Sequence, residues 1–209
     1  TVSFVAAGNY RINVSTSCPL STPTGTVVGD LLVASTMSRS VTFTPTGWTN
    51  QVQRVESSST SQATTIFTKV AEAGDLGSST TFIQSSSNRF LGQMLSFRKS
   101  TGSPSVLSTA TSLQTNNTTH DLAVVTGTAD NQMAVVAGSF VFADSGGAST
   151  TISINDSFVG WVQTTTASVS ENRLGVGYRA INDGVAVTGN METSSSISSQ
   201  SPQLAILLG

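Results

Sequence analysis

The sequence predicts an all-β protein: a single antiparallel β-sandwich, jelly-roll-like in plan, built from two related halves. Two observations predict this fold class. Apolar and polar residues alternate in short runs rich in β-branched residues, and no segment repeats its apolar residues at the 3.6-residue spacing of an amphipathic helix. The same order of strand and turn signals also occurs twice along the chain, which indicates an internal repeat.

Strand signals run along the whole chain, separated by turn-forming residues such as Ala-Gly-Asn at 7–9 and Asn-Asp-Gly at 182–184. In the first half we expect strands at Val2–Ala6, Tyr10–Val14, Asp30–Thr36, Trp48–Val55, Ala63–Val70, Thr80–Gln84 and Phe90–Arg98. In the second half we expect them at Asp121–Val125, Met133–Phe142, Phe158–Gln163, Arg173–Ile181, Val185–Thr188 and Gln203–Leu208. Many short strands at this spacing indicate a sandwich or a barrel.

Each repeat has an acidic turn and apolar strand, a Trp after Gly, an alternating strand ending in a basic residue, a turn and a final apolar strand. Either half alone would leave one apolar sheet face uncovered, so we expect the two to face each other around one core. The chain is therefore read as a single domain, 1–209. Its half-repeats are expected at about 26–98 and 127–209, with 99–120, rich in Ser, Thr and Asn, as the crossover.

The outer surface is expected to carry hydroxyl groups rather than charges. Charged residues make up 10% of the chain, whereas Ser and Thr make up roughly a third, and an ordinary domain has about a quarter charged residues. Lys69 and Lys99 are the only lysines, and the arginines are scattered, so the net charge is −2. Nucleic acid is not an expected partner, because binding it needs clustered basic residues. No apolar run reaches the length of a membrane span.

Few residues could support catalysis or bind a metal. His120 is the only histidine, and we expect it in a loop at a strand start rather than in a catalytic triad. Cys18 is the only cysteine and is interpreted as a small apolar core residue. Among the carboxylates, Asp30, Asp75 and Asp183 are expected in turns, and calcium at Asp144 or Asp156 lacks the usual ligand ladder. We expect no enzymatic activity, no catalytic residue, no metal and no cofactor.

Trp48 and Trp161 are the two candidates for stacking on a sugar ring. They follow Gly at what we take to be equivalent places in the repeat. Because a binding site rarely needs a copy in each half, the sequence favours core packing for both, and glycan stacking stays the alternative.

The stretch Val28–Arg98 resembles a β-sandwich family of tailed-bacteriophage virion proteins. The resemblance lies in Gly-Asp-Leu-Leu-Val-Ala at 29–34, Thr-Pro-Thr-Gly-Trp-Thr at 44–49, the strand ending Lys-Val-Ala at 69–71, and Phe-Leu-Gly-Gln-Met-Leu-Ser-Phe-Arg at 90–98. The family includes head decorations, head fibres and tail-fibre modules. Thr-Pro-Thr-Gly stands before Trp48 where typical members have a Pro-Pro-type turn. The resemblance implies a sandwich fold and a virion role, and it carries no catalytic residues.

Three functions follow as expectations. The first is a non-enzymatic virion structural protein, a capsid decoration (cement) or head-fibre protein, made in the host cytoplasm and acting through protein contacts. Its partners would be the major capsid protein or other virion subunits and further copies of itself, with a trimer as one arrangement. The second is a tail-fibre or adhesin module that binds host glycans. The third, least favoured, is a carbohydrate-active enzyme of jelly-roll type.

Overall fold

The computed structural model describes residues 1–209 except 58–61, 116–117, 143–151, 156, 162–171 and 195–199. It is an all-β structure whose sheets are antiparallel throughout, which confirms the predicted fold class. In the described part of the chain the only helical element is the short 3₁₀ turn η1 (Ala73–Asp75). The jelly-roll detail stays a prediction.

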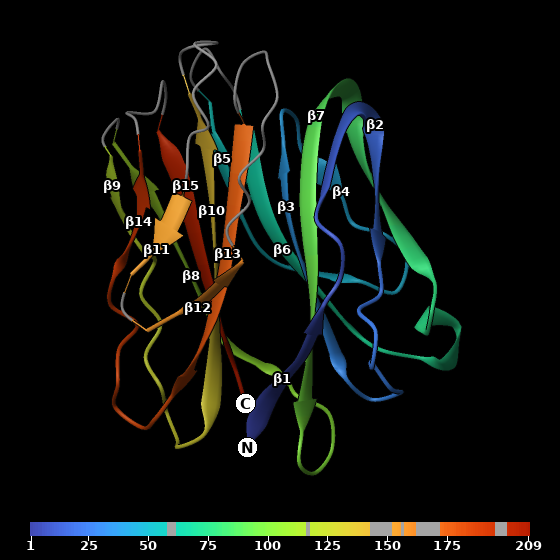
Figure 1. Ribbon diagram of the computed structural model, residues 1–209, viewed down its shortest axis with the longest axis vertical. Coiled ribbons are helices and arrows are strands. Elements are labelled where there is room, and N and C mark those ends of the chain that lie inside the picture. Colours follow the sequence, from blue (N-terminus) through green and yellow to red (C-terminus); the bar gives the residue numbers. More distant parts are fainter. Residues whose placement is uncertain (58–61, 116–117, 143–151, 156, 162–171, 195–199) are drawn as a thin grey trace.

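Two main sheets form the centre of the molecule and face each other (Figure 1). The first is the five-strand path of a seven-stranded sheet, and the second has five strands. The first main sheet has the spatial order β1 (Val2–Ala7), β7 (Ser79–Lys99), β3 (Leu31–Ser38), β6 (Gln62–Val70) and β5 (Thr49–Glu56). The second main sheet has the order β12 (Val159–Trp161), β13 (Asn172–Ile181), β10 (Gln132–Val141), β15 (Ser201–Leu208) and β8 (Val106–Gln114).

A small three-stranded layer, here called a wing, covers the outer side of each main sheet. The first wing consists of β4 (Thr42–Phe43), the N-terminal part of the long strand β7, and β2 (Arg11–Ser21). The second wing consists of β11 (Ile152–Ile154), β14 (Asn190–Thr193) and β9 (Thr119–Asp121). Figure 1 shows the four layers nearly edge-on, with the second wing at the left and the first wing at the right.

Three apolar clusters hold these layers together. The central cluster lies between the main sheets and takes residues from both halves of the chain, among them Val33, Ile66, Leu95, Val135, Val176 and Ile206. The first outer cluster, between the first main sheet and its wing, uses only residues 18–94. The second outer cluster, beneath the second wing, uses only residues 110–207. The sharing of the central cluster is what joins the two halves.

The central strands of the main sheets are buried on both faces, not on one as we expected from the sequence. Every described side chain of β3, β10 and β15 is buried. The reason is the pair of wings: a strand covered on both sides reads as a continuous apolar run, in the way that buried parallel strands do. The expectation that each half has a sheet with only one buried, apolar face was therefore wrong.

The internal repeat extends over the whole chain. Strands β1 to β6 correspond in order to β8 to β13, and the two parts of β7 correspond to β14 and β15. Every pairing has its counterpart: β3 pairs with β6 and β7 as β10 pairs with β13 and β15, and β4 and β2 flank β7 as β11 and β9 flank β14. The chain is thus two copies of one eight-strand plan.

The connection between the halves is shorter than the predicted crossover. β7 ends at Lys99 and β8 begins at Val106, so half of the segment expected as crossover lies in β8 and β9. Its alternating Ser, Thr and apolar residues pair with β15 at the edge of the second main sheet. Both chain ends lie at this connection, since the Ser100 N–H donates to the Thr1 carbonyl and the Gly209 N–H to the Ser105 carbonyl (3.1 and 3.0 Å).

Three other strand expectations differ from the structure. The segment predicted as a strand at Asp121–Val125 contributes only Asp121 to a strand, at the end of β9. The strands predicted at Thr80–Gln84 and Phe90–Arg98 are one continuous strand, β7, that bends from the first wing into the main sheet. The segment predicted as a strand at Val185–Thr188 makes a single bridge, between Ala186 and Thr126.

Candidate functional site

Turn residues with a positive φ show which residues of the two halves correspond to each other. Gly29 has φ 93° and lies just before β3, and Asn131 has φ 62° just before β10. Gly47 has φ 81° before β5, and Ser157 has φ 62° before β12. This left-handed region is easy for glycine and unusual for other residues. Gly29 therefore corresponds to Asn131, and Gly47 to Ser157.

The tryptophans do not occupy equivalent places, which corrects the sequence analysis. The residue after Gly47 is Trp48, and the residue after Ser157 is Phe158. Trp48 is 7% exposed and packs edge-on against Phe82 at 5.2 Å, so it has no free ring face for a sugar. Phe158 packs against the second outer cluster. Trp161 lies in β12, and its side chain falls outside the described residues.

Cys18 and His120 stand at the same place in the two wings. Cys18 pairs with Phe82 across the first wing, and His120 pairs with Met191 across the second. Both are fully buried. His120 is therefore an interior residue of β9 beside Phe140, with its Nε2 3.4 Å from the Thr193 hydroxyl, and not the loop residue that we expected. Burial raises the pKa of the Cys18 thiol to about 12, so it is protonated at neutral pH, as an apolar core residue would be.

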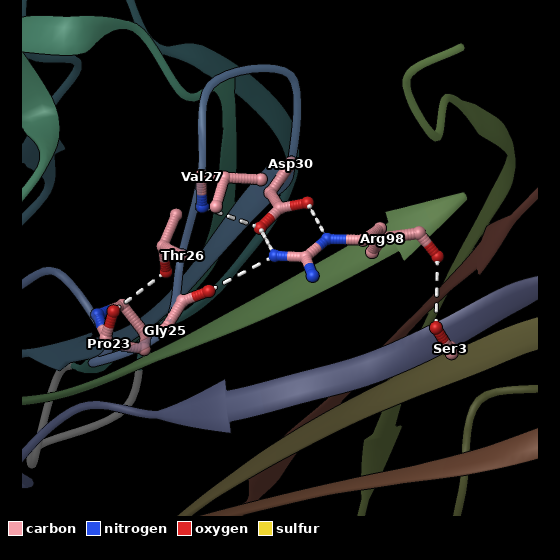
Figure 2. Close-up of polar contacts among 7 residues, drawn as sticks. All are labelled: Ser3, Pro23, Gly25, Thr26, Val27, Asp30 and Arg98. Carbon is pink, nitrogen blue, oxygen red and sulfur yellow. Dashed lines mark hydrogen bonds and ion pairs between the residues drawn. The ribbon is translucent and has the colours of Figure 1, made fainter. Parts of the chain in front are cut away.

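Asp30 and Arg98 form a network of hydrogen bonds at the turn that enters β3 (Figure 2). The Asp30 carboxylate accepts two hydrogen bonds from Arg98, from Nε and Nη2, both at 2.7 Å. It also accepts the Val27 N–H at 2.9 Å, and the same Nη2 donates to the Gly25 carbonyl at 3.0 Å. A fork-shaped guanidinium matched to a carboxylate is among the strongest side-chain pairs. This arrangement fastens the turn to β7.

The Asp30 side chain is 2% exposed, whereas that of Arg98 is 43% exposed. Burial alone would raise the pKa of Asp30, but the hydrogen bonds from Arg98 and from the Val27 N–H outweigh it, and the pKa lies below its usual value. Asp30 therefore remains ionised at neutral pH. Its carboxylate is fully engaged within the turn, which is a structural role.

The other carboxylates named from the sequence also have structural places, or lie outside the described residues. Asp75 caps η1 by accepting the Glu72 N–H (2.8 Å) and pairs with Lys69 (2.8 Å). Asp183 lies in the turn after β13. Asp144 and Asp156, the calcium candidates, fall outside the described residues.

The outward face of the first wing exposes large apolar residues among uncharged ones where β4, residues 17–21 of β2 and residues 79–83 of β7 lie together. Phe43 on β4 lies opposite Ile83 on β7, and the two are 55% and 48% exposed. Val41, just before β4, is 47% exposed. The inward neighbours Phe82, Cys18 and Leu20 are fully buried, so the alternate residues of these strands face outward: Ser17, Pro19, Ser21, Phe43, Ser79, Thr81 and Ile83.

The corresponding face of the second wing is polar. Ser153 lies opposite Glu192, which in turn lies opposite Thr119. This row matches the row of Phe43, Ile83 and Ser17 in the first wing. Asp121 is also exposed there, and the Asn155 amide donates to Glu192 at 2.7 Å. The shared fold therefore does not require apolar residues at this place.

Sequence reasoning missed the apolar face, although one signal for it was present. In the alternating strand Thr-Thr-Phe-Ile-Gln, Phe82 and Ile83 are adjacent, so one of the two must face outward. It missed the Arg98–Asp30 pair because nothing in the spacing links residues so far apart.

No protein-family model, curated protein or solved structure matches the chain. The described residues contain no helix long and apolar enough to cross a membrane. The resemblance to phage virion proteins thus remains an expectation from the sequence.

Proposed function

We propose that the chain is a non-enzymatic structural protein of a virus particle, a capsid decoration or head-fibre protein that acts through contacts with other virion subunits. The observation that carries the proposal is the outward face of the first wing. It exposes Phe43 and Ile83 among uncharged outward residues, at a place where the second half of the same chain is polar.

Exposed apolar surface in a rim of polar residues is typical of a protein contact site. Here the rim is made of hydroxyl groups, which lose less on burial than charged groups do. Two further features support a contact role: a surface poor in charge, and the resemblance of Val28–Arg98 to virion proteins. The glycan-binding alternative is not adopted, because Trp48 is packed inside the first outer cluster.

The proposal is tested by the content of purified virus particles from the source that encodes the chain. Quantitative mass spectrometry should find the chain in many copies per particle, in a fixed ratio to the major capsid protein. A low copy number would move the proposal to the tail or portal. Absence from intact particles, with the chain abundant in infected cells, would refute a virion role.

A further inference from the structure

We propose that the outward face of the first wing binds the same face of a second copy of the chain, across a two-fold axis. The contact is centred on Phe43 and Ile83, which are paired neighbours on β4 and β7. This inference rests on the proposed function and deepens it, because it names a second copy of the chain as the subunit that the same face contacts.

The apolar row is a feature of this half and not of the fold. Phe43 and Ile83 correspond in strand pairing to Ser153 and Glu192. The second wing covers its main sheet with a serine and a glutamate at these places, so neither Phe43 nor Ile83 is needed to build a wing. Two large apolar side chains that lie side by side, are about half exposed and are not needed by the fold are typical of a contact site.

The absence of charge favours a second copy as that partner. None of the seven residues named above as facing outward from the first wing is charged, so two copies can meet over them without like charges facing each other. Two second wings meeting in the same way would bring Glu192 and Asp121 of each copy together. A two-fold contact between identical patches is the commonest form of self-association, and apolar cores are typical of it.

Within one chain, the two repeats already pack against each other through equivalent faces. The central cluster contains equivalent residues of both main sheets, such as Val33 and Val135, and Ile66 and Val176. The edges are reversed between the sheets: β5 lies against β8, the counterpart of β1, and β6 lies against β15, the counterpart of the second part of β7. Equivalent faces therefore meet about a pseudo-two-fold axis. The proposed contact applies the same arrangement between two chains.

The test exchanges the apolar row for the residues of the other wing. The variant Phe43→Ser/Ile83→Glu introduces residue types that the second wing carries at the same place, and it should fold with an unchanged melting temperature. Sedimentation equilibrium should show a monomer–dimer equilibrium for the natural chain and a dissociation constant raised at least about tenfold in the variant. Val124→Glu, at a 57% exposed valine outside both wings, is the matched control and should leave the dimer intact.

A second variant keeps the test independent of how well the exchange folds. Thr81→Cys adds a thiol to the exposed face, and the natural Cys18 is buried. Mild oxidation should link two Thr81→Cys chains and leave the natural chain unlinked. A natural chain that is monomeric or trimeric, or a dimer that survives the exchange, would overturn the inference. These results would leave the virion proposal standing, since that depends on particle content.

Discussion

The two halves of this protein build the same turn in different ways. In the first half the buried Asp30 carboxylate holds the turn, and Arg98 neutralises it. In the second half Gln132 stands at the place of Asp30, and its Oε1 accepts the Thr128 and Ala129 N–H groups at 2.8 and 3.3 Å. The place of Arg98 is taken there by the last residue, Gly209. The comparison teaches that the fold needs an acceptor at this position, not a charge.

The outer clusters differ in a complementary way. Phe67 of the first main sheet corresponds to Gly177 of the second, where a Cβ atom would lie 2.8 Å from Ile154. In the first half the main sheet fills this space with the side chain of Phe67. In the second half the wing fills it with the side chain of Ile154, and the main sheet has a glycine there. Protein interiors are packed to a nearly constant density, so a smaller side chain in one layer has to be matched by a larger one in the layer that faces it.

The largest expected effect separates the two outer clusters. Phe82 and Met191 hold the same place in the two wings, and both are fully buried. Phe82→Ala should lower the free energy of unfolding by about 3–5 kcal/mol, because its ring contacts Trp48 and Phe67. Met191→Ala should cost less, about 2–3 kcal/mol, because flexible neighbours fill a methionine site more easily. Urea unfolding of both variants measures the difference. Equal costs would show that the two clusters contribute alike, and reversed costs would show that the second contributes more; either result would contradict the prediction.

An intermediate effect is expected where the charged and neutral turns differ, and it depends on pH. The folded-state pKa of Asp30 lies below its unfolded value, so its contribution is complete above about pH 4 and is lost as the pH falls through the folded pKa. Asp30→Asn should lower stability at pH 7 by about 1–2 kcal/mol, nearer the lower figure because the partly exposed Arg98 is screened by water.

The same variant should lose stability less steeply than the natural chain between pH 4 and pH 2. Thermal unfolding across this range provides the measurement. As a control, Asp121→Asn on the exposed face of the second wing should change stability at pH 7 by less than about 0.5 kcal/mol. An Asp30→Asn variant as acid-sensitive as the natural chain would place the acid response elsewhere.

The smallest expected effect tests the residue correspondence itself. Gly29→Ala should cost about 1 kcal/mol, because its φ of 93° is strained for alanine while the added Cβ would make only an ordinary contact, 3.7 Å from the Ser103 hydroxyl. Gly29→Asn should cost about half of that, since asparagine accepts the left-handed region, as Asn131 does in the other half. Differential scanning calorimetry at neutral pH can rank the three chains. If asparagine were as costly as alanine, the two turns would not be interchangeable.

The strands and the internal repeat could be predicted from the sequence, but the division of the strands into four layers could not. The acidic turn, the alternating strand and the apolar closing strand are visible because each is a local pattern. The wings were missed because their strands are short: β4 has two residues, and β9 and β11 have three each. Trp161 was matched to Trp48 because both follow glycine, whereas the true counterpart, Phe158, follows a serine whose unusual φ has no sequence signal.

The site could be predicted only in part. The turn positions of Asp30 and Asp75 follow from local chemistry, but the partner of Asp30 lies on β7, 68 residues away in the chain. The exposed face of the first wing needs the pairing of β4 with β7, which a run of two residues cannot specify. Long-range pairing is therefore what sequence reasoning lacked here.

The meeting of both chain ends at the connection between the halves has a practical consequence. Thr1 and Gly209 are bonded to Ser100 and Ser105, so a short linker could close the chain, and a cut within 100–105 could open it again. The resulting circular permutant would carry its halves in the opposite order with every strand in place. Proteins fused at Thr1 or at Gly209 would extend from the same end of the molecule and would not cover the outward face of either wing.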